Sequence, residues 1–590
     1  MRSPGEQRGL LSPLRRTQDV VRLGSDRFDV LVIGGGVVGA GVALDAVSRG
    51  LSVALVEARD WAAGTSSRSS KLIHGGLRYL EQLEFGLVHE ALVERGLLLR
   101  RLAPHLVRPV SFLLPLTRRF TQRPYYGAGV LAYDVFAAVS PFGRGMPHHR
   151  HLSRAATLAH FPGLRPDAVV GAIEYHDAQV DDARMVLALA RTAARYGATL
   201  ATSARVVGLL RDGERVIGAR VRDLESGQDH DVRARAVVAA TGVWSDDIGE
   251  LLALSAPQAR SGMAKATRMG LRVRASKGVH LVLPRHLIDG DLGLILRTEK
   301  SVLFVIPWGR HWLVGTTDTD WSLDRDHPAA SSSDIGYLLE RLNAVLARPV
   351  SRADIQGVYA GLRPLLAGES DATSRLSREH AVVEPAPGLV VIAGGKYTTY
   401  RVMARDAVDE ATRYWPGVPA SGTRHLPLVG ARDFHRTWAE RDRLAGISGL
   451  PAGRVERLLG RYGDRIVELF DLLGERPELA QPILGAPEYL LVEAYYAACA
   501  EGALHLDDVL TRRTRISVET AHRGVRCAEQ VARLIGPVLG WDEALVRREV
   551  EHYVARVAAE RESQTMPDDH TADAARLGAP DVRGSSVRAT

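Results

Sequence analysis

The sequence predicts an α/β fold in three parts: a domain built on a strand-helix-strand unit, a second domain built on a mixed or antiparallel sheet, and a helical C-terminal domain. Residues 29–57 pass from an apolar run to a glycine turn, a helical pattern and a second apolar run. Short segments rich in Val, Leu and Ile then recur between residues 206 and 392, which is more β structure than one doubly wound domain requires. Beyond about residue 419, amphipathic helical periodicity replaces the strand signals.

The individual elements follow from this periodicity. In the first unit, residues 29–33 and 51–57 are expected as strands and residues 36–48 as the helix between them. Further helices are expected at 182–196, 454–461, 489–501 and 518–534, and further strands within 206–238, 271–283, 292–305, 311–315 and 389–392. The expected organisation is a flexible extension at 1–26, a discontinuous α/β domain at 27–418 with an interleaved substrate-binding sheet domain at about 270–355, a helical domain at 419–560 and a disordered tail at 561–590.

The composition is that of a globular protein, with 46% hydrophobic and 25% charged residues, and it excludes wholesale disorder. The net charge of +7 comes from dispersed arginines rather than a polybasic block, so we expect no nucleic-acid partner. The two cysteines, Cys499 and Cys527, supply no ligand cluster, so we expect no metal site and a reducing, cytoplasmic compartment. No window approaches about 18 consecutive apolar residues, so no membrane-spanning segment is expected.

Lysine is rare in this chain, because only five of the 76 basic residues are lysines. A lysine retained in so arginine-rich a sequence is expected where a compact ammonium cannot be exchanged for a guanidinium. Lys71, Lys277 and Lys396 fall within the motifs described below, whereas Lys265 and Lys300 fall outside them. The first three are therefore candidates for functional roles.

A glycine motif, Gly34-x-Gly36-x-x-Gly39, follows the first predicted strand and opens the first predicted helix. Gly34 allows a tight turn, Gly36 lets the backbone approach a pyrophosphate, and Gly39 lets the helix and strand pack closely. The helix N-terminus offers unpaired N–H groups to phosphate oxygens. Glu57, at the end of the next strand, can accept hydrogen bonds from an adenosine ribose and disfavours a ribose 2′-phosphate. The pattern predicts a Rossmann-like dinucleotide site.

Two further segments favour FAD over NAD as the dinucleotide. An apolar strand at residues 237–242 ends in Thr241-Gly242 and is followed by Trp244, as in flavoproteins that close such a strand over the adenosine. Residues 64–79 combine hydroxyl side chains with paired glycines, which let backbone donors approach a phosphate or a flavin ring. The candidate cofactor contacts in this block are Thr65, Ser66, Ser67, Lys71, Leu72, His74, Gly75 and Gly76.

Four motifs resemble the FAD-dependent glycerol-3-phosphate dehydrogenases of the aerobic, quinone-linked type: S-S-K-L-I-H-G-G-L-R-Y-L at 69–80, S-K-G-V-H at 276–280, G-L-R-P-L at 361–365 and G-G-K-Y-T-T-Y-R at 394–401. The resemblance extends over residues 27–560 and includes further matches at 180–184, 306–308 and 315–318. One departure is Tyr397, at a position where the family often has an apolar residue. It implies FAD as the cofactor of the 27–418 domain, with Gly395, Lys396, Thr398 and Thr399 in its site.

The same resemblance implies oxidation of sn-glycerol 3-phosphate to dihydroxyacetone phosphate, with electrons passed to a quinone. A phosphate dianion requires several cationic donors, and the expected clamp consists of Arg78, Arg363 and Lys396, with Tyr79 as an additional hydroxyl donor. The family property of membrane quinone reduction implies a peripheral protein on the inner face of the cell membrane. The apolar and arginine-rich stretch at 97–123 is compatible with an anionic surface, and an oligomer is compatible with the sequence.

Loss of a hydride from C2 to the flavin also requires a base for the hydroxyl proton. His74, beside two glycines of the flavin-facing block, is the first candidate, and His280 is the alternative. Either histidine can instead orient the substrate, and Lys277 can polarise the hydroxyl or hold the phosphate. Asp182 is interpreted as a helix N-cap.

Other interpretations remain at this point. A glycerol-phosphate oxidase that reduces O2 would carry the same motifs, and a non-catalytic flavin-binding or nucleic-acid-associated protein is a further alternative. The dispersed arginines disfavour the last of these. The charged run at 507–515 is interpreted as solvated or as an inter-domain contact, without a catalytic role.

Overall fold

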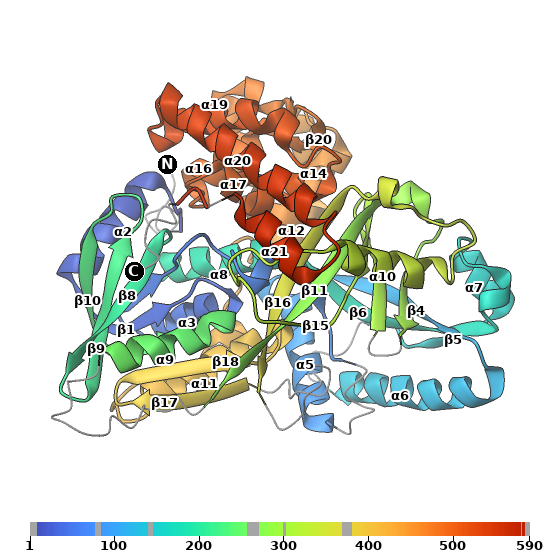
Figure 1. Ribbon diagram of the computed structural model, residues 1–590, viewed down its shortest axis with the longest axis horizontal. Coiled ribbons are helices and arrows are strands. Elements are labelled where there is room, and N and C mark those ends of the chain that lie inside the picture. Colours follow the sequence, from blue (N-terminus) through green and yellow to red (C-terminus); the bar gives the residue numbers. More distant parts are fainter. Residues whose placement is uncertain are drawn as a thin grey trace.

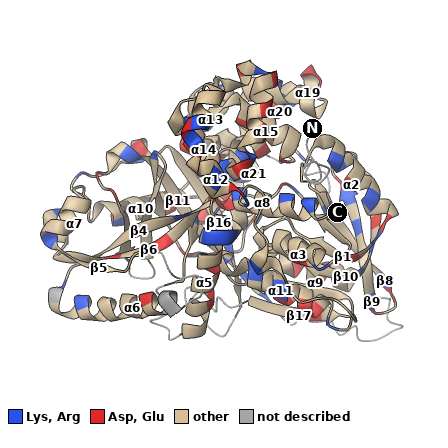
Figure 2. Ribbon diagram, turned by 180° about the vertical axis from the view of Figure 1, so that it is seen from behind, with Lys and Arg blue, Asp and Glu red and all other residues tan. Residues whose placement is uncertain are grey.

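The computed structural model describes residues 9–76, 84–139, 146–255, 271–298, 302–367, 380–579 and 581–583. Figure 1 shows two sheet-based regions side by side, with a helical domain lying across the top of both. Lys and Arg are interspersed with Asp and Glu over all three regions rather than gathered on one face (Figure 2). The predicted three-part α/β architecture is confirmed.

In the described residues, the first sheet has eight strands in the order β17-β18-β10-β1-β2-β7, with the hairpin β8–β9 attached to β10. The central strand β1 (Arg27–Ile33) runs parallel to β2 (Val53–Val56) on one side and β10 (Asp229–Ala239) on the other. The remaining strands are β7 (Thr199–Ala201), β8 (Ala204–Asp212), β9 (Arg215–Asp223), β17 (His380–Ala386) and β18 (Leu389–Gly394).

Both faces of this sheet are covered. Because side chains alternate along a strand, Val30 and Val32 of β1 enter one core and Leu31 and Ile33 enter the other. The first core is completed by helices α3 (Val37–Ser48), α8 (Asp182–Arg195) and α11 (Tyr400–Ala411), and the second by α2 (Pro13–Ser25) and α9 (Ser245–Leu254). A near-continuous apolar run in β1 is what a strand buried on both faces requires.

The second sheet has ten strands among the described residues, in the order β15-β11-β14-β13-β12-β4-β6-β3, with β16 paired to β11 and β5 paired to β6. Its pairings are antiparallel except for β12 with β4. Its strands are β3 (Leu72–Ile73), β4 (Val107–Leu116), β5 (Arg150–Ser153), β6 (Gly171–Val180), β11 (Val273–Pro284), β12 (Gly293–Arg297), β13 (Val302–Trp308), β14 (His311–Gly315), β15 (Thr319–Trp321) and β16 (Gly357–Leu366). The predicted limits of about 270–355 were too narrow, because half of these strands come from other parts of the chain.

Strand β11 shows how the two faces of the second sheet differ. Val279 and Leu281 pack in a core with helix α10 (Ser332–Asn343). Val282 packs on the opposite face, in a core that also contains Val130 of helix α6 (Arg119–Val139). Helices α5 (Phe85–Leu97) and α7 (Arg154–His160) complete this region.

The helical domain is formed by elements that follow residue 419. Its helices are α12 (Phe434–Ala439), α13 (Arg441–Ser448), α14 (Ala452–Tyr462), α15 (Ile466–Glu475), α16 (Leu491–Ala500), α17 (Leu506–Asp508), α18 (Ile516–Glu519), α19 (Ala528–Leu539), α20 (Glu543–Ser563) and α21 (Asp569–Leu577), with a hairpin of β19 (Pro482–Ile483) and β20 (Ala486–Leu490). The single helix expected at 518–534 is divided into α18 and α19, because Gly524 adopts a left-handed conformation with φ +84° between them.

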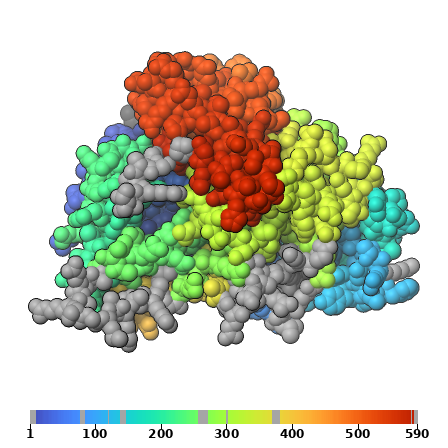
Figure 3. All heavy atoms as spheres, viewed as in Figure 1, coloured from blue at the N-terminus to red at the C-terminus, as the bar shows by residue number. Residues whose placement is uncertain are grey.

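The chain is more ordered near its termini than the sequence predicted. Residues 13–25 of the predicted flexible extension form α2, and residues 569–577 of the predicted disordered tail form α21. Arg576 is buried, and Asp569 forms an ion pair with Lys277 in the second sheet. In Figure 3 this red segment lies across the front of the molecule, between the green and yellow-green regions. Polar side chains become ordered here because the rest of the protein supplies their partners.

Candidate active site

A large cavity lies between the two sheets. Its volume is about 1460 Å³, and its walls include the ends of β1, β2 and β10 together with residues of β4, β11 and β16. Pockets for drug-sized ligands usually occupy about 300–1,000 Å³. The cavity therefore has room for a dinucleotide and a small substrate together.

The glycine motif shapes one end of this cavity. Gly34 has φ +107°, a value that side-chain-bearing residues rarely adopt, and a Cβ on Gly39 would overlap the carbonyl oxygen of Gly34. Gly36 differs, because it lines the cavity and a Cβ there would approach only the hydroxyl of Ser66, at 3.2 Å. Gly34 and Gly39 are thus required by the fold, whereas Gly36 leaves space for a ligand.

Polar groups surround this glycine turn. The hydroxyl of Ser66 accepts a hydrogen bond from the N–H of Val37, the first residue of α3, at 3.0 Å. Glu57 accepts hydrogen bonds from the N–H groups of Gly35 (2.6 Å) and Arg59 (2.8 Å), and its side chain lines the cavity. Burial raises the pKa of Glu57, and the two N–H donors oppose that rise. The carboxylate has acceptor capacity for further hydrogen bonds from a bound ribose.

Two arginines that the sequence analysis missed, Arg59 and Arg68, also line the cavity. Burial, followed by the positive charges of Arg59, Arg576 and Arg512, lowers the pKa of Arg68 to about 9. Such crowding of cations beside a helix N-terminus favours an anion such as a diphosphate. The residues present therefore fit a dinucleotide such as FAD. Arg68 lies within the 64–79 block, so its position in that motif could have identified it as a candidate cofactor contact.

Most of the predicted cofactor contacts reach the cavity. These are Gly34, Gly36, Glu57, Thr65, Ser66, Leu72, His74, Gly76, Thr241, Gly242, Trp244, Gly395 and Lys396. Others do not line it and lie behind its wall: Gly39, Ser67, Lys71, Gly75, Thr398 and Thr399. Thr398 illustrates this supporting position, because its hydroxyl lies 3.2 Å from the backbone nitrogen of His74 and 3.3 Å from its carbonyl oxygen.

Lys71 corrects a prediction, because its ammonium does not face the cavity. The Nζ atom lies 2.8 and 2.9 Å from the two carboxylate oxygens of Asp182 and 3.0 Å from the carbonyl oxygen of Ser67. Burial and the nearby Arg515 lower the pKa of Lys71 to about 8. Asp182 is consequently an ion-pair partner, and the N-cap of α8 is its neighbour Asp181, which accepts from the N–H of Arg184.

Arg363, on β16, lines the cavity at its other end, here called the substrate end, and Lys396 also lines the cavity. The Arg363 guanidinium lies 3.3 Å from the hydroxyl of Ser276 and 3.0 Å from that of Thr316. A Cβ on Gly278 would lie 2.6 Å from the guanidinium, so this glycine provides the space that Arg363 occupies. The S-K-G-V-H and G-L-R-P-L motifs are therefore brought together by the pairing of β11 with β16.

His280 lines the same end of the cavity. Its ring stacks on Tyr359 at a centroid distance of 4.8 Å, and its Nε2 lies 2.9 Å from the hydroxyl of Ser70. Its buried Nδ1 has no hydrogen-bond partner within the described part of the chain. Burial, and then the charges of Arg363 and Lys71, hold the pKa of His280 well below its usual value, so the ring is neutral near pH 7.

Lys277 is a second correction, because it lies on the opposite face of β11 from His280. Its Nζ atom is 2.6 Å from Asp334 of α10 and also pairs with Asp569 of α21, and the side chain is fully buried. Side chains alternate between the two faces of a strand, so Ser276, Gly278 and His280 cannot share a face with Lys277. Lys277 therefore joins α10 and α21 to the sheet and does not line the cavity.

Two predicted substrate contacts, Arg78 and Tyr79, lie outside the described residues. The sequence analysis also missed Ser70 as a partner of His280, and no local pattern distinguished it from the adjacent serines. Across the ranges that the structure describes, no group of three or more His, Cys, Asp or Glu side chains is placed to hold a metal ion. None of the helices in those ranges has the length and apolar character that a membrane crossing requires.

Comparison with known proteins defines the class first. A family model described as FAD dependent oxidoreductase matches residues 29–410, and one described as the C-terminal domain of alpha-glycerophosphate oxidase matches residues 421–546. The fold and cavity are thus those of an FAD-dependent oxidoreductase.

Individual relatives then identify the family. Glycerol-3-phosphate dehydrogenase 2 of Mycobacterium tuberculosis is 56% identical over 574 residues, which cover 97% of this chain and 95% of that protein. The mitochondrial glycerol-3-phosphate dehydrogenase of Homo sapiens is 36% identical, covering 91% of this chain and 74% of that protein. The solved glycerol-3-phosphate dehydrogenase from Bacillus halodurans complexed with FAD aligns with a TM-score of 0.73 and 27% identity, over 93% of this chain and 98% of that one. This chain belongs to the FAD-dependent glycerol-3-phosphate dehydrogenase family, and FAD is its cofactor.

Proposed function

We propose that this enzyme oxidises sn-glycerol 3-phosphate at C2 to dihydroxyacetone phosphate. The names of the relatives support this substrate. The observation that carries the proposal is that Arg363, Lys396 and His280 all line the FAD cavity, with Arg363 close enough to His280 to lower its pKa. Bound FAD supplies the hydride acceptor, and the protein supplies orientation and charge.

Arg363 and Lys396 are proposed to hold the phosphate of the substrate. An arginine offers paired N–H donors to phosphate oxygens, and a lysine adds a point charge. The hydroxyls of Ser276 and Thr316 fix the guanidinium plane before the substrate arrives. A preorganised clamp of this kind places C2 in one orientation with little loss of side-chain entropy on binding.

The base is proposed to be His280. The sequence placed His74 first, and both rings line the cavity. The contacts of His280 favour it, because its ring is fixed by Tyr359 and Ser70 and is held neutral by burial and by Arg363. A bound phosphate dianion would offset the charge of Arg363 and so strengthen His280 as a proton acceptor.

Anaerobic mixing with sn-glycerol 3-phosphate tests this function. We expect the absorbance band of oxidised FAD to bleach in a single turnover, and sn-glycerol 1-phosphate and glycerol to bleach it far more slowly. His280→Asn should slow bleaching at saturating substrate more than His74→Asn does, with the binding of dihydroxyacetone phosphate retained by both variants. An unbleached flavin with sn-glycerol 3-phosphate would refute the substrate, and the reverse ranking of the histidine variants would return the role of base to His74.

We also propose a quinone as the electron acceptor. One arm of the cavity is apolar and aromatic, and it lies between the second sheet and α6; its lining includes Phe112, Leu114, Tyr126, Tyr175, Ile295 and Phe304. Such a surface suits an apolar ring better than it suits a charged acceptor. In an aerobic assay with a soluble quinone analogue, we expect quinone reduction to exceed peroxide release. Phe304→Asn should slow quinone reduction while leaving anaerobic flavin bleaching unchanged. Peroxide formation at the full turnover rate would instead support a glycerol-phosphate oxidase.

Peripheral contact with the inner face of the cell membrane is proposed for α6. Phe120, Leu131 and Val135 of this helix are 87%, 55% and 53% exposed. The predicted stretch at 97–123 needs correction, because Leu97 and Leu98 belong to the core and β4 is largely buried. The exposed apolar surface of this region is therefore that of α6. The same helix contributes Tyr126 to the apolar arm of the cavity. A lipid-dissolved quinone would therefore meet the cavity where the helix meets the lipid.

Sedimentation with vesicles of phosphatidylglycerol and phosphatidylcholine tests this contact. We expect the protein to sediment with anionic vesicles, and the double variant Phe120→Ser/Leu131→Ser to remain in the supernatant. Leu254→Ser is a matched control, because Leu254 is 83% exposed on α9. High salt should weaken binding by the wild type if Arg118 contributes. Equal sedimentation of wild type and double variant would exclude α6 as the contact.

A further inference from the structure

The segment at residues 57–71, here called the cofactor loop, forms much of one wall of the FAD cavity. Its wall-forming members include Glu57, Arg59, Thr65, Ser66, Arg68 and Ser70. Apart from a single 3₁₀ turn at Thr65–Ser67, the loop has no helical or strand structure of its own. Its shape therefore depends on contacts made by side chains and backbone groups outside the loop.

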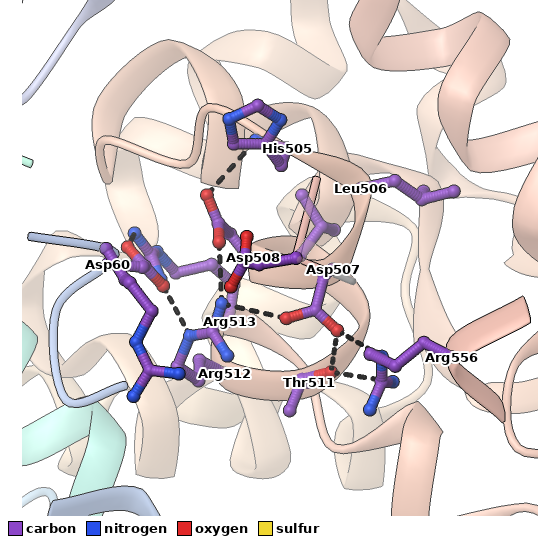
Figure 4. A network of polar contacts seen from close by, with 12 residues as sticks. Asp60, His505, Leu506, Asp507, Asp508, Thr511, Arg512, Arg513 and Arg556 are labelled. Atoms are coloured by element: carbon purple, nitrogen blue, oxygen red, sulfur yellow. Dashed lines mark hydrogen bonds and ion pairs between the residues drawn. The ribbon is translucent and has the colours of Figure 1, made fainter. Parts of the chain in front are cut away.

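The first such contact is at Asp60, which is fully buried (Figure 4). Arg513 approaches both of its carboxylate oxygens, with Nη1 and Nη2 each 2.7 Å away. Arg512 adds a third bond through Nε, at 2.5 Å. Figure 4 shows the carboxylate of Asp60 entering from an N-terminal segment and meeting arginines that belong to the helical domain. A bidentate, buried arginine pair fixes direction as well as distance.

The two arginines are themselves held in place by the helical domain. They lie in a π-helical turn, Val509–Arg513, which is closed by a bond from the N–H of Thr514 to the carbonyl oxygen of Val509. Arg512 also donates to Asp508 at 2.6 Å, and Arg513 donates to the carbonyl oxygen of Glu501 at 3.1 Å. Single π-helical turns occur frequently at functional sites. Here the turn presents two consecutive guanidinium groups to one carboxylate.

A second contact holds the other end of the cofactor loop. Arg515 donates to the carbonyl oxygen of Ser67 at 3.3 Å and to Asp182 at 2.5 Å. Lys71 shares the same two acceptors. Ser66, immediately before Ser67, is the residue whose hydroxyl meets the first N–H of α3. The two contacts therefore lie on either side of the part of the loop that faces the glycine turn.

We propose that Arg512, Arg513 and Arg515 are positioning residues for FAD. None of the three lines the cavity, yet each holds the cofactor loop at Asp60 or Ser67. A contact that served only to join the domains could end on any surface of the first sheet, whereas these end on the loop that forms the cavity wall. These three arginines thus contribute to cofactor affinity from behind the cavity wall.

The test compares Arg513→Gln and Arg515→Gln with Arg191→Gln. Arg191 is a matched control, because it is also buried and joins α8 to the helical domain, through Glu468 (3.3 Å) and Tyr496 (2.7 Å), without contacting the cofactor loop. Full-length protein is freed of FAD and titrated with it, well below the melting temperature, by flavin fluorescence and visible circular dichroism. Loss of a residue that orients a metal ligand typically weakens metal binding by about 10- to 100-fold. We expect an increase in the Kd for FAD of the same order in the two test variants, because they lose a contact that orients the cavity wall.

Arg191→Gln is expected to lower the melting temperature while the Kd for FAD stays within about twofold of wild type. The proposal is overturned if the Arg513 and Arg515 variants keep the wild-type Kd, or if Arg191→Gln raises the Kd equally. Should Arg513→Gln not fold, Arg513→Lys retains the charge but loses the bidentate geometry. That variant is expected to raise the Kd by at least about threefold, and a wild-type Kd would again refute a positioning role.

Discussion

The two ends of the cavity are built in different ways. At the dinucleotide end, the backbone shapes the site through Gly34, Gly39 and the start of α3. At the substrate end, charged and polar side chains shape the site, with Arg363 and His280 as the main examples; they lie on two paired strands that are far apart in the sequence. Where the backbone shapes a site, one added Cβ atom can abolish both folding and binding. Where side chains shape a site, a single substitution removes only the interactions of that side chain.

The largest effect is expected at the dinucleotide end. Gly39→Ala places a Cβ on the carbonyl oxygen of Gly34, so β1 and α3 cannot pack, and we expect little folded protein. Gly36→Val meets no backbone and should leave the melting temperature of the FAD-free protein within a few degrees of wild type. Its side chain nonetheless enters the cavity, so FAD affinity should fall by more than about tenfold, or about 1.4 kcal/mol. Thermal unfolding and the ratio of FAD to protein distinguish the two variants. Stoichiometric FAD in Gly36→Val would contradict the assignment of this turn.

At the substrate end, Arg363→Ala should lower kcat/KM for sn-glycerol 3-phosphate by roughly 10²- to 10³-fold, because charge-assisted contacts are each worth about 1.5–3 kcal/mol. Lys396→Ala should cause a smaller decrease in the same direction. FAD content should stay near wild type in Arg363→Ala, since this side chain serves the substrate. Steady-state kinetics and flavin absorbance measure both quantities. Loss of FAD with a normal KM would move Arg363 from the substrate clamp to the cofactor site.

Lys277 tests the limits of the substrate end. It is close to His280 in the sequence, but its side chain lies on the opposite face of β11. Lys277→Met leaves Asp334 without its cationic partner, and breaking a buried pair costs about 3 kcal/mol or more. We expect a lower melting temperature and faster proteolysis within α21, which loses the contact at Asp569. With saturating FAD, the KM for sn-glycerol 3-phosphate should remain within about twofold of wild type. A large rise in KM would place Lys277 at the substrate after all.

The smallest effect concerns His505, in the charged network behind both ends. Burial and Arg583 lower its pKa, but the hydrogen bonds that His505 donates to Glu225 and Glu549 outweigh them and raise the pKa to about 9. Because its pKa is higher in the folded state, protonated His505 makes its full contribution to stability below about pH 6.5. This contribution is lost as the pH rises through 9. The difference in unfolding free energy between wild type and His505→Gln should therefore shrink by about 3 kcal/mol between pH 6 and pH 9.5. Chemical denaturation at several pH values measures it, and a difference independent of pH would contradict the charged state.

The sequence predicted local features well, because they depend on neighbours along the chain. The glycine turn needed only the strand before it and the helix after it. Lys277 was misplaced because the pattern S-K-G-V-H does not say which face of the strand meets the cavity, and that is decided by α10. Lys71 was misplaced because its partner, Asp182, is 111 positions away. The order in α21 was missed because its charges are compensated by residues such as Lys277.

The position of the cofactor loop near the start of the chain has a consequence for synthesis. The walls of the cavity run from Ile33 to Leu577, and the arginines that hold the loop come at 512–515. At ribosomal rates of about 5–20 residues per second, the glycine turn waits roughly half a minute to two minutes for its last wall. The complete cavity is therefore available to FAD only after residue 577 has been synthesised.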